Sequence, residues 1–216
     1  SKNMTKFLII RHGQSTANLE ERYAGWYDAP LTELGRKQAA ITTDYILKNY
    51  HVDAVYSSDL IRAVETVKEI AARANVPLVK EKALREIDGG EWEGKQVEEI
   101  AREYPEQAYL WKTDIGKARP TGGESFAELQ VRIDSALRKI AAENDGKTVV
   151  IASHGGAIRT MQCLFENVPI EDMRKVPWTP NASVSEVNYE NGKYTPVRLG
   201  YTGHLGTLIT EIPLMR

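Results

Sequence analysis

The stretch FLIIRHGQSTAN, residues 7–18, joins four apolar side chains directly to Arg11, His12 and Gly13. A short apolar run bounded by charge is typical of a buried parallel strand, because it is too short for a helix. In open parallel sheets, ligands bind outside the carboxyl ends of the strands. We therefore expect a strand over residues 6–10 that leads into a functional site.

A second stretch repeats this arrangement later in the chain. KTVVIASHGGAIR, residues 147–159, also passes from an apolar strand through His154 and Gly155 into a helical pattern. A glycine after each histidine permits a sharp turn and the close approach of a ligand to the backbone. Because free N–H groups at helix N-termini attract anions, we expect both histidines to lie beside one bound anion.

Two arginines at the same predicted edge also indicate an anion site. Arg11 ends a buried strand, where a charge needs a partner, and Arg62 lies in the first turn of a predicted helix, where a cation opposes the macrodipole. A phosphoryl group between them would remove both penalties. The structural alternative for Arg62 is an ion pair with Glu65 or Glu69. A metal site is disfavoured, because the histidines lack metal-ligand spacing and the arginines would repel a cation.

The rest of the chain alternates between strand and helix patterns. Further strands are expected at residues 52–57, 76–79 and 147–152, and helices at residues 34–50, 58–74, 124–143 and 157–165. Thr32 is expected to cap the first helix, and Ser58 or Asp59 the second. Asn191-Gly192 predicts a hairpin, and Pro196 makes its second strand an edge. The pattern predicts an α/β fold: a three-layer α/β/α sandwich whose mostly parallel central sheet has an antiparallel edge strand.

Residues 89–123 interrupt the alternation. The segment is rich in charged and aromatic side chains, holds one helical pattern at residues 96–104, and ends in RPTGGES. We expect a lid-like insertion of helices and loops over the active-site end of the sheet. Residues 1–216 then form a single domain, in which residues 1–3 are expected to be a cloning remnant.

Composition is that of an ordinary globular protein. The chain has 216 residues, of which 42% are hydrophobic and 27% charged, and a net charge of −2. That charge gives no field to attract nucleic acid or an anionic membrane, and no segment has the form of a signal peptide or a membrane span. Cys163 is the only cysteine, so no intrachain disulfide is expected. We expect a cytoplasmic protein with a small-molecule partner, and the oligomeric state stays open.

Four motifs resemble the signature of the histidine phosphatase superfamily, also called the phosphoglycerate mutase-like superfamily. LIIRHGQSTAN, YSSDLIRAVETV, LREIDGGEWEG and VIASHGGAIR occur in the family's order and span most of the chain. The resemblance implies that His12 is a nucleophile that forms a phosphohistidine. It implies that Arg11, Arg62 and His154 hold the phosphoryl oxygens, and that Glu86 protonates the leaving alcohol and then activates water.

The resemblance also implies substrate contacts from Asn18, Gly25, Gly155 and Gln14, although Gln14 could instead brace its loop. Ala24 stands where many relatives have a polar residue, so we expect weaker contacts from the loop that holds Gly25. No metal and no cofactor is expected, because arginines and helix N-termini supply the positive field.

Three functions fit these motifs. A metal-independent phosphatase is favoured, because the acid lies in REIDGGEWEG and a short insertion ends in PTGGES. A 2,3-bisphosphoglycerate-dependent phosphoglycerate mutase is the alternative, although mutases of the family have a longer chain and insertion. A catalytically silent binding module is disfavoured, because every charged catalytic residue is retained. The identity of the phosphomonoester is left open.

Five other side chains are less informative. Trp92, Trp111 and Trp178 belong either to the core or to a substrate pocket. His204 is expected to pack against the domain, and His51 to be a solvated turn residue.

Overall fold

The structure of the chain is a computed structural model that describes residues 3–210. Residues 1 and 2, part of the predicted cloning remnant, lie outside the described residues, as do residues 211–216.

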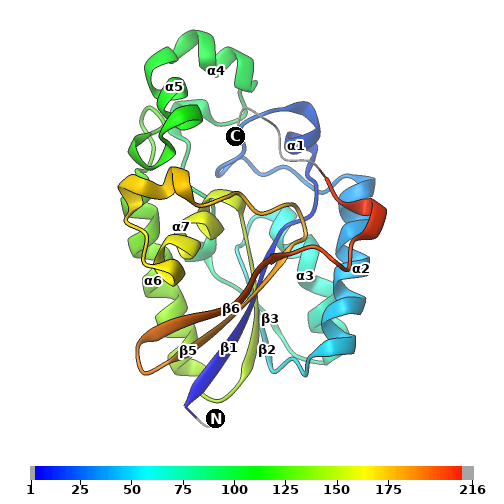
Figure 1. The fold of residues 1–216 in the computed structure, drawn as a ribbon. Helices are drawn as coiled ribbons and strands as arrows, with labels where there is room; N and C mark the ends of the chain where they lie inside the picture. Colours follow the sequence, from blue (N-terminus) through cyan, green and yellow to red (C-terminus); the bar gives the residue numbers. More distant parts are fainter. Residues whose placement is uncertain (1–2, 211–216) are drawn as a thin grey trace.

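The described strands form one six-stranded sheet in the order β3-β2-β4-β1-β5-β6 (Figure 1). They are β1 (Met4–Arg11), β2 (Ala54–Ser57), β3 (Leu78–Lys80), β4 (Thr148–Ser153), β5 (Val184–Glu190) and β6 (Lys193–Tyr201). Strands β1 to β4 are parallel, whereas β5 is antiparallel to both β1 and β6. The mostly parallel sheet is confirmed, and its antiparallel edge is a two-stranded hairpin.

The hairpin turn has the predicted form. Asn191 and Gly192 have φ angles of 52° and 77°, the left-handed values that a two-residue turn between twisted strands requires. β6, which contains Pro196, is the edge strand. A proline is tolerated there because an edge strand has one side without a neighbour to pair with.

Helices cover both faces of the sheet and complete the three predicted layers (Figure 1). One face is covered by α2 (Glu33–Asn49) and α3 (Ile61–Ala74), and the other by α6 (Phe126–Glu143) and α7 (Gly155–Glu166). Successive side chains of β1 belong to opposite layers: Phe7 and Ile9 pack with α6 and α7, and Leu8 and Ile10 with α2 and α3. This explains why residues 7–10 of β1 are all apolar.

One helix cap differs from the prediction. Thr32 caps α2 as expected, accepting the Gly35 N–H at 3.0 Å. α3 begins only at Ile61, and its N-cap, Leu60, makes no side-chain capping bond, so the predicted cap at Ser58 or Asp59 is wrong. Asp59 instead pairs with Arg85, with Nε and Oδ1 2.6 Å apart. The polar side chains before α3 therefore serve tertiary contacts.

Residues 89–123 form helical structure beyond the carboxyl ends of the strands (Figure 1). The segment contains η2 (Gly90–Trp92), α4 (Val97–Glu103), α5 (Pro105–Thr113) and η3 (Ile115–Lys117). α4 matches the predicted helix at residues 96–104. α5 was not predicted, although its first residue is a proline, which favours a helix start.

Short helices complete the described chain. They are α1 (Thr16–Glu20), η1 (Lys82–Leu84), η4 (Ile170–Lys175) and η5 (Gly206–Leu208). No helix within residues 3–210 combines the length and the apolar character needed to cross a membrane.

Candidate active site

The two His-Gly elements meet on neighbouring strands. β1 and β4 pair in parallel, with Arg11 opposite Ser153, so the residues beyond them leave the sheet side by side. The ring centroids of His12 and His154 are 5.2 Å apart, and both side chains are buried. The structure thus brings the two histidines to one point at the carboxyl edge of the sheet.

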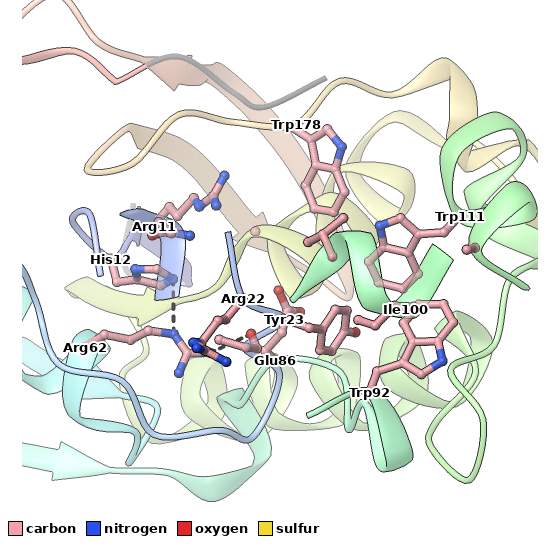
Figure 2. A pocket seen from close by; sticks show the side chains of 15 residues that line it. Arg11, His12, Arg22, Tyr23, Arg62, Glu86, Trp92, Ile100, Trp111 and Trp178 are labelled. Atoms are coloured by element: carbon pink, nitrogen blue, oxygen red, sulfur yellow. Dashed lines mark hydrogen bonds between the residues drawn. The ribbon is translucent and has the colours of Figure 1, made fainter. Parts of the chain in front are cut away.

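The contacts of His12 define the protonation of its ring. Nδ1 lies 2.7 Å from the carbonyl oxygen of Gly13, which can only accept a hydrogen bond. Nδ1 therefore carries the proton, and Nε2 keeps its lone pair. The Arg62 Nε donates to this Nε2 at 3.3 Å (Figure 2). Since His12 lines the pocket, the ring presents an unprotonated nitrogen beside a cation.

Arg62 is 1% exposed and is oriented by carbonyl groups. Its Nη1 donates to the Tyr27 carbonyl at 2.8 Å, and its Nη2 donates to the carbonyls of Ala24 and Gly25 at 3.0 and 2.7 Å. Glu65, one proposed ion-pair partner, instead accepts the N–H of Leu31 at 3.1 Å. The loop before α2 therefore aims the guanidinium at His12.

Glu93 holds that loop in place, a role that the sequence did not reveal. Its carboxylate accepts backbone N–H groups at 2.7–3.0 Å from Gly25, Trp26, Tyr27 and Gly89. The carbonyls of the same loop hold Arg62. Glu93 therefore positions Arg62 without touching it; the second acid of GEWEG was its only sequence signal.

Gly25 belongs to this framework and is not among the described residues that line the pocket. A Cβ at this position would lie 2.1 Å from the Ile87 carbonyl oxygen, so only glycine fits. Its N–H binds Glu93 and its carbonyl binds Arg62. Tight backbone packing thus gives Gly25 a supporting place in the loop, and its substrate contact stays a prediction.

Arg11 and Gly155 lie against each other. The Arg11 Nη1 donates to the Thr179 carbonyl at 2.6 Å, and a Cβ on Gly155 would come within 3.0 Å of the guanidinium carbon. Both residues line the pocket. The glycine predicted to admit a ligand therefore also makes room for the arginine.

Glu86 occupies the N-terminus of α7. One carboxylate oxygen accepts the Gly156 N–H at 2.7 Å, and the other accepts the N–H groups of Ala157 and Ile87 at 2.8 and 2.9 Å. A Cβ on Gly156 would lie 2.6 Å from this carboxylate. The helix N-terminus predicted to bind the phosphoryl anion is thus used by a side-chain carboxylate, which the helix dipole also favours.

Arg132, on α6, supports the segment that carries Glu86. It donates to the carbonyls of Ala83, Arg85 and Glu86 at 2.7–2.9 Å, and its guanidinium pairs with Glu124 at 2.8 Å. The sequence did not mark Arg132 as a supporting residue, because its partners are backbone carbonyls remote in sequence.

His154 is fully buried and not among the described residues that line the pocket. Its Nε2 lies 2.8 Å from the Ser58 hydroxyl, and its Nδ1 has no hydrogen-bond partner within residues 3–210. Burial, and then the nearby Arg62 and His12, lower the pKa of His154 well below its usual value. The ring is therefore neutral at neutral pH, a hydrogen-bonding group and not a cationic clamp.

The two amides predicted to bind substrate differ in orientation. Asn18 lines the pocket, and its Oδ1 accepts the Ser15 N–H at 3.0 Å and the Asn181 amide at 3.3 Å, which leaves its NH₂ group to donate to a ligand. Gln14 does not line the pocket, and its Oε1 accepts the Thr32 hydroxyl at 2.8 Å. The structure thus favours the loop-bracing role for Gln14.

The pocket is charged at one end and aromatic at the other (Figure 2). The aromatic wall is made by Tyr23, Trp92, Trp111 and Trp178. The three tryptophans therefore line the pocket, and Trp92 is in addition buried. His204 packs as predicted, stacked on Tyr45 and Tyr201, and His51 is exposed. No cluster of three or more metal-ligating side chains occurs within residues 3–210.

Comparisons with known proteins show the family and the fold to which the chain is similar. The profile of the histidine phosphatase superfamily (branch 1) matches residues 7–202. Phosphoserine phosphatase 1 of Hydrogenobacter thermophilus is 35% identical over 211 residues, which cover 96% of this chain and 98% of that protein. 2,3-bisphosphoglycerate-dependent phosphoglycerate mutase 2 of Gloeobacter violaceus is 35% identical over 181 residues, covering 80% and 81%. The solved structure of Bacillus stearothermophilus YhfR superposes with a TM-score of 0.87 at 31% identity, covering 93% of this chain and 99% of that one.

Proposed function

This chain belongs to the histidine phosphatase superfamily, and we propose that it hydrolyses small phosphomonoesters through a phosphohistidine on His12, with Glu86 as general acid and base. The observation that carries the proposal is the state of the His12 ring. Its Nδ1–H is held by the Gly13 carbonyl, and its Nε2 lone pair lies beside Arg62. A nucleophile thus adjoins a cation that can hold phosphoryl oxygens.

In the first step, Nε2 of His12 attacks phosphorus and the ester P–O bond breaks. The charge that spreads over the phosphoryl oxygens is met by Arg11, Arg62, Asn18 and the neutral His154, whose Nδ1–H tautomer can donate. The Gly13 carbonyl stabilises the imidazole as it becomes positive. Glu86, protonated when the phosphate dianion is bound, gives its proton to the leaving alkoxide.

In the second step, water attacks the phosphohistidine. Glu86, now a carboxylate, takes a proton from the water while the P–N bond breaks and inorganic phosphate forms. The three backbone N–H groups that bind Glu86 fix the direction of its carboxyl group. Arginine side chains supply the positive charge throughout, so the scheme requires no metal ion.

A phosphoglycerate mutase is the second candidate, supported by the mutase relative. A mutase would pass the phosphoryl group from His12 to a second hydroxyl and would need to hold another anionic group of its substrate. Among the described residues that line the pocket, Arg22 is the one cation outside the phosphoryl end, and it already pairs with the Glu20 carboxylate at 3.1 Å. This favours hydrolysis.

One experiment separates these functions. The protein is incubated with chelator and a panel that includes O-phosphoserine, to which one relative's name points, and 3-phosphoglycerate with a trace of the 2,3-bisphosphate. We expect free phosphate to exceed any isomerised product, and peptide mapping of the quenched enzyme to locate a base-stable phosphohistidine at His12. Faster isomerisation than phosphate release would favour the mutase, and absence of any turnover the binding module.

We also infer the cytoplasm as the place of action. Cys163, the only cysteine in the sequence, is a buried free thiol, as is usual for a protein of a reducing compartment. Burial raises the pKa of this thiol to about 11, so it is unreactive at neutral pH.

A further inference from the structure

We propose that the pocket selects phosphomonoesters whose alcohol part is apolar and of aromatic size, and that it discriminates against amino-acid phosphates such as O-phosphoserine. The inference rests on the phosphatase function proposed above and assigns the substrate class of that same site. It starts from the half of the pocket that lies beyond the phosphoryl end.

The walls of this half are apolar. Tyr23, Trp92, Trp111 and Trp178 line it, and Figure 2 shows their rings gathered on the side away from Arg11 and His12. Smaller apolar side chains of α4 and α5 also line the pocket: Val97, Ile100 and Ala108. When a ligand moves from water into this space, its binding free energy becomes more favourable in proportion to the apolar area it buries.

The aromatic wall is built before any ligand binds. The Tyr23 ring meets Trp92 and Trp111 edge to face, with centroids 5.5 Å apart in both pairs, and Trp111 in turn packs on Phe126 at 5.2 Å. Phe126 is fully buried in the core. Because these rings hold one another and are anchored to the core, binding an apolar group requires little reordering of the wall.

Charged alcohols find few matching partners among the described residues that line the pocket. O-phosphoserine carries an ammonium and a carboxylate close to its ester oxygen. Glu86 is the one acid among the described residues that line the pocket, and both its oxygens already accept backbone N–H groups. Arg22, the cation nearest the aromatic half, donates to the Glu20 carboxylate and the Gly94 carbonyl. Both charges of phosphoserine would be desolvated without full compensation.

The first test compares three esters that leave as primary alcohols, so that leaving-group chemistry differs little. We expect kcat/KM to fall in the order 2-phenylethyl phosphate, ethyl phosphate, O-phosphoserine, with roughly tenfold or more between the first and last, as apolar pockets give for small changes of side group. An equal or higher value for phosphoserine overturns the inference and leaves the phosphatase intact. Absence of hydrolysis of all three overturns both.

The second test removes part of the wall. Trp178 is partly buried and lies under the Arg159 guanidinium at 4.8 Å, so Trp178→Ala is a milder change than loss of the buried Trp92. We expect KM for 2-phenylethyl phosphate to rise about tenfold while kcat/KM for ethyl phosphate changes less than about twofold. General damage to the fold would instead lower kcat/KM for both esters.

A control variant comes from the insertion at residues 89–123. Tyr109, on α5 like Trp111, is 67% exposed and does not line the pocket. Tyr109→Ala should leave the kinetics of both esters unchanged. If Trp178→Ala behaves like Tyr109→Ala, or lowers both esters equally, the aromatic wall does not select the substrate and the inference is wrong.

Discussion

His12 lies after β1 and His154 after β4, and each precedes a glycine, yet the two rings have different surroundings. After β1 the chain runs through a loop before α1, and the Gly13 carbonyl turns back onto Nδ1 of His12. After β4 the chain enters α7 at once, and the first N–H groups of that helix bind Glu86. The element after each histidine therefore decides the role of its ring: a loop directs one ring to the pocket, and a helix buries the other beside it.

The largest expected effect comes from removing the ring that lines the pocket. His12→Ala deletes the proposed nucleophile, so we expect turnover to fall by roughly 10⁵-fold and the phosphoenzyme to disappear. Release of inorganic phosphate measures turnover, and retention of a labelled phosphoryl group on the protein measures the phosphoenzyme. The exposed His51 supplies the control, since His51→Ala should change neither. Label that persists in His12→Ala would show that another residue is the nucleophile.

Substitution of His154 should reduce turnover less than substitution of His12. His154 is expected to supply one hydrogen bond to the phosphoryl group, and loss of one such donor costs about 10²–10³-fold in kcat. His154→Gln keeps a polar group near the Ser58 hydroxyl, so the fold should survive. Single-turnover experiments should still place the phosphoryl group on His12. If His154→Gln abolished the phosphoenzyme as fully as His12→Ala, the two histidines would not have separate roles.

The glycines after β4 give a third way to test the difference. A Cβ in Gly156→Ala would collide with the Glu86 carboxylate at 2.6 Å, so the acid must move. We expect kcat to fall about 10²-fold for alkyl phosphates, within the range for loss of a general acid, and much less for p-nitrophenyl phosphate, whose leaving group needs no proton. Glu86→Gln should show the same dependence on the leaving group. An equal loss on both substrates would mean that the collision disturbs the phosphoryl end instead.

Much of this comparison could be predicted from the sequence. The apolar run of β1 and its twin in β4 indicated buried parallel strands, and parallel strands place their carboxyl ends together, which brings His12 to His154. The sequence also singled out Arg62 as a cation with an unfavourable place on its helix. These features are local, so they can be recognised in a single stretch of residues.

The supporting contacts could not be predicted in this way. Glu93 and Arg132 bind backbone atoms of loops that reach them only after folding, so no spacing in the sequence marks them. For the same reason the polar residues before α3 were mistaken for a cap, when Asp59 is bound by Arg85. The aromatic wall depends on Trp111 of α5 packing on Phe126 of α6, and a tryptophan pattern alone does not distinguish a pocket from a core.

The smallest expected effect concerns stability and pH. Burial, and then Arg62 and His12, lower the pKa of His154 well below its usual value, so the unfolded chain binds a proton near pH 6 that the folded chain does not. Below about pH 6.5 this lowers the free energy of unfolding by up to about 1.4 kcal/mol for each pH unit, and above it the contribution is constant. Urea unfolding between pH 5 and pH 7.5 should therefore show a shallower pH dependence for His154→Gln than for the unmodified chain. The half-buried ring of His204 has a less strongly lowered pKa, so His204→Gln should remove a smaller part of the pH dependence of the free energy of unfolding. If His154→Gln keeps the full slope, the ring is charged in the folded protein and acts as a cationic clamp after all.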